Sequence, residues 1–133
     1  MLTLIAALCL ASSPLRGPGL VDLPAQLERV TAALGAGDAD AAAEHFDRTV
    51  EVVLPGGVED ILAREAAAAA LAAFFARHPP RSFARVHGGT SAGRDGSYVI
   101  GTLATAGGRS FRVYVYGSGA GAVKVQELRI EEE

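Results

Sequence analysis

The sequence predicts an α+β domain in which three helices from the N-terminal half pack on a curved antiparallel sheet. Two observations predict this class. Apolar residues recur at helical spacing along residues 23–34 and 61–77, whereas they alternate with a period of two along residues 50–54 and through most of residues 82–130. Turns rich in glycine and proline separate the alternating segments. The predicted order is helix, helix, strand, helix and then four strands.

Capping and breaking residues bound the predicted helices. The second helix spans about Ala39–Phe46 behind Asp38, and the third spans about Ile61–Arg77 behind Asp60, because aspartate is a favoured N-cap. Pro79–Pro80 ends the third helix. The first helix ends at a pair of glycines and carries an apolar stripe formed by Leu23, Leu27, Val30 and Leu34.

The predicted strands are short and alternating. They comprise Val50–Leu54, Ser82–His87, Tyr98–Thr105, Phe111–Tyr116 and Val123–Ile130. In the last strand Val123 and Val125 have one parity, whereas Leu128 and Ile130 have the other. A β-bulge near Gln126–Glu127 would place all four on one face and bend the sheet around the helices. The alternative is that both faces of this strand are partly covered.

Composition limits the function classes. A chain of 133 residues fits one domain, and its net charge of −3 excludes the basic footprint of a nucleic-acid-binding protein. Cys9 is the one cysteine, so an internal disulfide and a cysteine-based metal site are both excluded. No histidine pair has the helical spacing of a metal site, and we expect no metal and no cofactor.

The N-terminal residues predict export. The apolar run Leu2–Ala11, followed by two serines, is typical of a signal peptide and is too short to span a bilayer stably. We expect residues 1–20 to be a leader and residues 21–133 to form the domain, periplasmic or secreted after cleavage. Lipidation at Cys9 is not expected, because the preceding Leu8 is bulky. The alternative is a disordered or core-packed N-terminal extension.

The order of these elements carries a family resemblance. The chain resembles the nuclear-transport-factor-2-like (cystatin-like cone) superfamily and, within it, a family of short secreted bacterial domains of unknown function. The segments that carry the resemblance are Phe46–Asp47, Val50–Gly56, Phe74–Phe75, Pro79–Pro80, Phe83, His87–Gly88, Ile100–Leu103, Phe111–Tyr114 and Gln126–Glu131. The resemblance implies a half-open cone, often dimeric, sometimes with a pocket between helices and sheet, and it brings no catalytic motif.

The face of the sheet toward the helices is predicted to be apolar. Phe111 and Val113 share that inner face, while Glu51 lies opposite Val50 and Val52 and should point away. An inner face without carboxylates argues against acid–base catalysis. We therefore predict a non-catalytic module that binds a small apolar ligand or an envelope protein, with pocket candidates Phe46, Phe75, Ile100, Phe111 and Val113.

His87 is the best catalytic candidate. The wider superfamily includes isomerases and dehydratases, whose chemistry needs an acid or base inside the cone. His87 ends a predicted strand beside two glycines, and either His87 or a tyrosine would be the pocket group in an isomerase- or hydratase-like alternative. A structural histidine is the competing interpretation.

The opposite, outer face of the sheet is predicted to carry an interface. Its candidates are Arg112, Tyr114, Tyr116 and Arg129, with Glu127 as the alternative to Arg129 beside them. Tyrosine and arginine are enriched at interface hot spots. The resemblance implies a homodimer through this face. An antiparallel sheet can equally show a polar face to water, and a purely structural dimeric interaction domain remains a third hypothesis.

Overall fold

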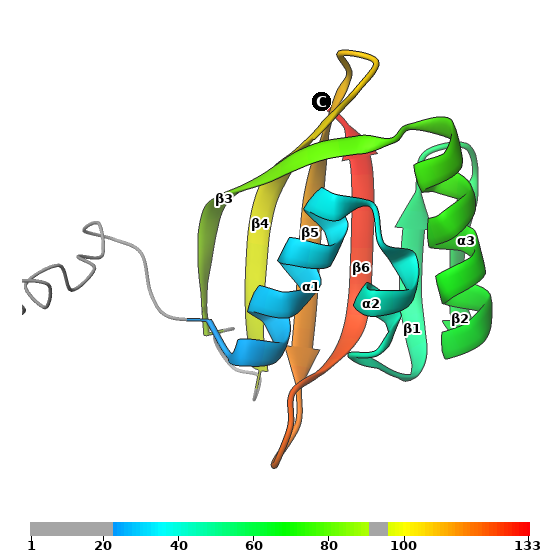
Figure 1. The fold of residues 1–133 in the computed structure, drawn as a ribbon. Coiled ribbons are helices and arrows are strands. Elements are labelled where there is room, and N and C mark those ends of the chain that lie inside the picture. The colour runs from blue at the N-terminus through cyan, green and yellow to red at the C-terminus, as the bar shows by residue number, and fades with distance from the viewer. Residues whose placement is uncertain (1–22, 91–95) are drawn as a thin grey trace, which may run out of the picture.

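The computed structural model describes residues 23–90 and 96–133 of the chain. Three helices precede or interrupt a single sheet (Figure 1). The helices are α1 (Ala25–Ala36), α2 (Ala39–Ala43) and α3 (Arg64–Arg77). The strands are β1 (Phe46–Leu54), β2 (Val58–Ala63), β3 (Pro80–Thr90), β4 (Gly96–Thr105), β5 (Ser110–Ser118) and β6 (Lys124–Glu132). The predicted leader, residues 1–20, lies outside the described residues.

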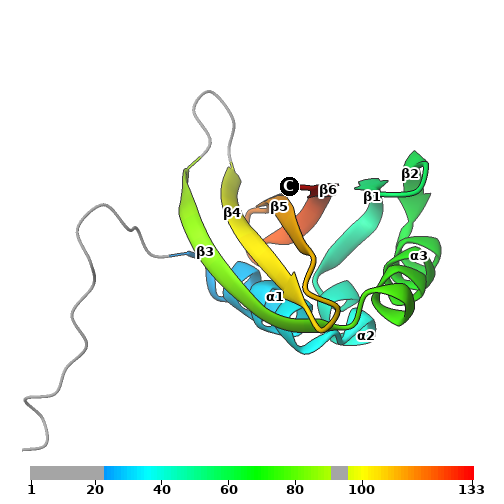
Figure 2. The ribbon, with the colours of Figure 1, turned by 90° about the horizontal axis from the view of Figure 1, so that it is seen from above.

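The sheet has six strands in the order β2-β1-β6-β5-β4-β3. Four neighbouring pairs are antiparallel, and β1 pairs with β6 in parallel. The prediction of a wholly antiparallel sheet is wrong for this pair. A parallel pair needs a long crossover, which the chain supplies through the elements from β2 to β5. The sheet curves around α1 and α2, as Figure 2 shows. The combination of three helices with one mainly antiparallel sheet confirms the predicted α+β class.

Strand β2 replaces the start of the predicted third helix. The predicted cap Asp60 and the residue Ile61 pair with Val52 and Glu51 of β1, and α3 begins only at Arg64 with Ala63 as its N-cap. The reason lies in the preceding turn. Gly56 and Gly57 have φ values of 99° and 104°, which reverse the chain so that it returns along β1.

The second helix is shorter than predicted. Asp38 is its N-cap, as predicted, with its carboxylate accepting a hydrogen bond from the Ala41 N–H at 3.0 Å. The helix ends at Ala43, and Phe46 already belongs to β1. Phe46 is completely buried, so this extension of β1 places a large ring beneath the helices.

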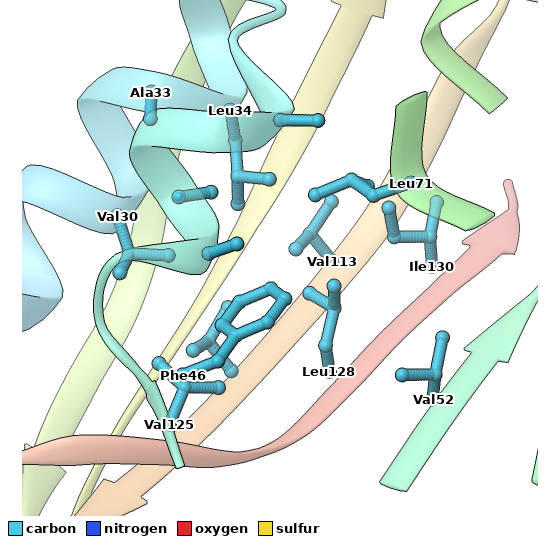
Figure 3. Close-up of a cluster of buried hydrophobic side chains, with 14 of the residues drawn as sticks. Val30, Ala33, Leu34, Phe46, Val52, Leu71, Val113, Val125, Leu128 and Ile130 are labelled. Carbon is cyan, nitrogen blue, oxygen red and sulfur yellow. The ribbon is translucent and has the colours of Figure 1, made fainter. Parts of the chain in front are cut away.

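The core fills the space between the helices and the inner face of the sheet. Figure 3 shows Phe46 among the apolar side chains that α1, α3 and the strands contribute. The Phe74 ring meets Phe111 edge-on with centroids 5.1 Å apart. Thr105 is the one buried polar residue of the described part of the chain. The expectation of an inner face without carboxylates agrees with this core.

The predicted β-bulge lies at Gln126. Tyr116 pairs with Glu127 and Gly117 pairs with Val125, so Gln126 is the extra residue on β6. Beyond it the parity changes, and Val125 and Leu128 are both buried on the inner face. The parity conflict in the sequence therefore predicted a real feature of the backbone.

Candidate functional site

The candidate site is an open hollow on the outer face, which is the face of the sheet opposite α1 and α2 (Figure 2). Strands β4, β5 and β6 supply its floor. Its volume is about 430 Å³, and its lining residues are Ile100, Arg112, Tyr114, Glu127, Arg129 and Glu131. A volume of this size falls in the range of ligand-binding pockets.

Strand register brings these side chains together. Ile100 of β4 pairs with Tyr114 of β5, which pairs in turn with Arg129 of β6. Arg112 pairs with Glu131 two positions further along the same two strands. Because alternate residues of a strand share a face, all of them point away from the buried Val113 and Ile130. The outer face thus combines an apolar floor with two cations and two anions.

The charges of the hollow are unequally paired. Arg129 Nη1 lies 3.2 Å from Glu127 Oε2, and the Glu127 side chain is only 17% exposed. Arg112 and Glu131 are direct cross-strand neighbours, yet within the described part of the chain neither makes an ion pair. Arg112 and Glu131 are both exposed.

A row of rings leads into the hollow from the edge of the sheet. His87 of β3 stacks on Tyr98 with ring centroids 5.4 Å apart, and Tyr98 stacks on Tyr114 at 6.3 Å. A hydrogen bond of 2.7 Å joins Tyr98 Oη and His87 Nδ1. His87 is exposed on this outer row, so the catalytic candidate lies outside the cone and does not line the hollow.

The five pocket candidates do not meet in one cavity. Phe46, Phe111 and Val113 are packed inside the core. Phe75 is 6% exposed and reaches a separate open hollow between α3 and the turn that joins α1 to α2. The inner-face placement of Ile100 is wrong, because the buried β4 residues are Val99 and Leu103 and the alternation turns Ile100 outward.

Three of the four interface candidates lie together in the hollow. Tyr116, the fourth, is 3% exposed and packs against Gly96, where a β-carbon would lie 2.6 Å from its ring. Tyr116 has the outer-face parity predicted for it, but it is buried, because its ring occupies the space that a side chain at Gly96 of the neighbouring strand would fill. Glu131 was the lining residue that sequence reasoning missed, although its position two residues after Arg129 is the signal that places it there.

The described residues contain no group of three or more His, Cys, Asp or Glu side chains arranged to hold a metal ion. None of their helices combines the length and apolar character needed to cross a membrane.

Comparison with known proteins first identifies the fold class. A solved NTF-2 like protein of unknown function from Burkholderia xenovorans is 21% identical, with a TM-score of 0.58 over 82% of this chain and 80% of that chain. At this identity the likeness concerns the fold alone. The expected cystatin-like, NTF2-like architecture is thus confirmed.

The family follows from a match to residues 27–131 by the model of DUF4783, a domain of unknown function. The chain belongs to this family. A DUF4783 protein from Bacteroides fragilis is 28% identical, with a TM-score of 0.72 over 84% of this chain and 100% of that chain. One from Bacteroides ovatus is 26% identical, with a TM-score of 0.71 over 79% and 93%. A comparison with curated proteins found no match.

Proposed function

We propose that this domain is an exported, non-catalytic binding module that docks a protein partner on its outer face. The observation that carries the proposal is the hollow, in which an apolar floor is surrounded by arginines and glutamates. Interfaces combine buried apolar groups with a polar rim, and tyrosine and arginine are their typical anchors. The apolar run Leu2–Ala11 supports export.

A protein partner fits this face better than a small apolar ligand inside the cone. Phe46, Phe74 and Phe111 fill the interior, which supports a structural role for the inner face. The hollow is open and carries four charged side chains, which a small apolar molecule would desolvate without pairing them. A protein surface can supply both the apolar contact and the opposite charges.

The proposal is tested by site-specific cross-linking in the native cell envelope. A photoreactive amino acid is introduced at Thr102, which shares the outer face, and at Ala69, which is exposed on α3. Mass spectrometry then identifies the cross-linked species. We expect adducts from Thr102 with a defined protein, which includes a second copy of this chain. Adducts from Ala69 alone, or none at either position, would contradict the proposal.

One observation favours a catalytic role as a second candidate function. The 2.7 Å hydrogen bond between Tyr98 Oη and His87 Nδ1 is the type of pairing that moves a proton. An isomerase- or hydratase-like reaction would use these two groups on the outer row. If a reaction is found, His87→Ala should abolish it, and full activity in that variant would exclude this role for His87.

The exported location is tested at the N-terminus. Mass spectrometry of the mature protein from the periplasm or medium should find a chain that begins near Val21. An intact Met1 on a cytoplasmic protein would contradict this part of the proposal.

A further inference from the structure

We propose that the end of the sheet where β3 and β5 begin and β4 ends binds a small soluble phosphate monoester between the guanidinium groups of Arg81 and Arg109. The site is another hollow, of about 420 Å³, which we call the arginine hollow. The residues that contribute polar groups to it are Arg81, Ser82, Thr105, Gly108, Arg109 and Ser110. None of them lines the hollow on the outer face, so a ligand here goes beyond the docking of a protein partner.

Strand pairing brings three segments of the chain together at this end of the sheet. Ser82 of β3 lies opposite Ala104 of β4, which lies opposite Ser110 of β5. The Ala106 N–H donates a hydrogen bond of 2.8 Å to the Pro79 carbonyl oxygen, which joins the turn between β4 and β5 to the residue just before β3. Figure 1 shows this turn at the top of the view, above the start of β3. Two serines from different strands therefore share one hollow.

Arg109 is held in position by the fold itself. Its carbonyl oxygen accepts hydrogen bonds from the N–H of the buried Thr105 at 3.0 Å and from the hydroxyl of Thr105 at 2.8 Å. Its guanidinium carbon lies 5.7 Å from the centre of the Phe111 ring, and a cation over an aromatic face is attracted to it. A side chain that is already positioned loses less conformational entropy when it binds a ligand.

A β-bulge directs Arg81 toward the same hollow. Pro80 pairs with Thr105 and Ser82 pairs with Ala104, so Arg81 is the extra residue on β3. A bulge turns a side chain away from the direction that strict alternation would give it. The exposed side chain of Arg81 lines the arginine hollow from β3, while Arg109 lines it from the turn before β5. Two guanidinium groups from separate segments therefore converge on one volume.

The side chains favour a phosphate monoester as the ligand. The charged residues that line this hollow are arginines, whereas the hollow on the outer face combines arginines with glutamates. A guanidinium group binds phosphate or carboxylate oxygens through two parallel hydrogen bonds. Two arginines and two serine hydroxyls offer more donors than the two oxygens of a carboxylate can use, so the three terminal oxygens of a phosphate monoester fit better. The volume lies in the range of small-molecule pockets, which leaves room for the organic part of the ligand.

Glu132 competes with the ligand for Arg109. Arg109 Nη2 lies 2.8 Å from Glu132 Oε2, and the two side chains are 53% and 58% exposed. An ion pair this exposed to water is weak, so a phosphate group can displace the carboxylate. We expect Glu132→Gln to tighten phosphate binding by about two- to fivefold, because it frees Arg109. Glu131→Gln is the matched control, since it removes the same charge one residue away without freeing Arg109, and it should leave the affinity unchanged.

Isothermal titration calorimetry of the full chain with glycerol 3-phosphate, at fixed pH and ionic strength, tests the site. We expect saturable binding at one site, with weaker binding of acetate and none of glycerol. Arg81→Gln and Arg109→Gln should each weaken binding by about tenfold or more, because each loses hydrogen bonds to a charged group. Arg77→Gln removes an exposed arginine at the end of α3 and should have no effect. Circular dichroism checks the folding of every variant.

Several results would overturn the inference. They are no binding of glycerol 3-phosphate at millimolar concentration, equal affinity for acetate, or unchanged affinity in both Arg81→Gln and Glu132→Gln. These two variants decide the question if Arg109→Gln fails to fold. Binding that is lost in Arg112→Gln but kept in Arg81→Gln would place the anion in the hollow on the outer face. Binding to vesicles that contain phosphatidic acid, without binding to glycerol 3-phosphate, would reject a soluble ligand in favour of a lipid headgroup.

Discussion

Gln126 donates a hydrogen bond from Nε2 to Oδ2 of Asp47 over 3.2 Å, and so connects β6 to the start of β1. Its Oε1 atom accepts a second hydrogen bond from the Ser118 hydroxyl at 3.0 Å. Gln126 is the bulged residue, which has no cross-strand partner of its own on β5. The bulge therefore directs one side chain to join three strands.

Replacing Gln126 with alanine should lower the free energy of unfolding by about 1–2 kcal/mol, because both hydrogen bonds are partly buried. Urea unfolding of the two proteins measures the difference. Ser118→Ala is the matched control, and it should have a smaller effect because it removes only one of the two bonds. Equal stability of wild type and Gln126→Ala would show that the bridge contributes nothing.

Asp47 should make the free energy of unfolding depend on pH. The Arg48 backbone N–H and then the Gln126 side chain hydrogen-bond its carboxylate, and they hold the pKa of Asp47 below its ordinary value of 3.8. A carboxyl group whose pKa is lower in the folded state than in the unfolded state stabilises the fold at pH values above its unfolded-state pKa. That contribution to stability is lost as the pH falls through the pKa of the group in the folded state.

The measurement compares wild type with Asp47→Asn by urea unfolding at neutral pH and at pH values below 3.8. The advantage of wild type should be full at neutral pH and should shrink in acid. A difference that stays constant across this range would contradict the assignment of the shift to Asp47.

The parts of the fold that alternation specifies were predictable from sequence. The change of parity between Val125 and Leu128 predicted the bulge, because strict alternation could not bury both. Strand β2 was missed because Val58–Ala63 is short and precedes an alanine-rich helix. Its partner β1 is a tertiary contact that local propensity does not contain.

Part of the candidate site was also predictable from the alternation of side chains along the strands. Arg112 and Tyr114 followed from the alternation of β5, whose apolar residues are unambiguous. Ile100 was misplaced because an isoleucine on a polar face looks like a core residue when its partners are unknown. The burial of Tyr116 depends on Gly96, which is next to it only after β4 and β5 pair.

Gly101 should tolerate no side chain. It lies on the inner face of β4, where a β-carbon would be 2.6 Å from the Ala84 carbonyl oxygen and would overlap the Phe83 ring. Gly101→Ala should therefore destabilise the domain by about 1–3 kcal/mol through overpacking. Gly107→Ala is the control, because no atom lies within 4 Å of a β-carbon there. Thermal unfolding compares the two, and equal melting temperatures would contradict the close approach of β3 and β4.

Phe46 provides a test of whether the inner face packs or binds. The ring is completely buried against the sheet, and its truncation to alanine leaves a cavity that the rigid surroundings only partly close. We expect Phe46→Ala to lower the free energy of unfolding by about 3–5 kcal/mol. Ile61→Ala, at a position 67% exposed, should change it by less than about 0.5 kcal/mol. If Phe46 instead lined a ligand pocket, its truncation would cost little in the purified protein, and small apolar molecules would stabilise the wild type more than the variant.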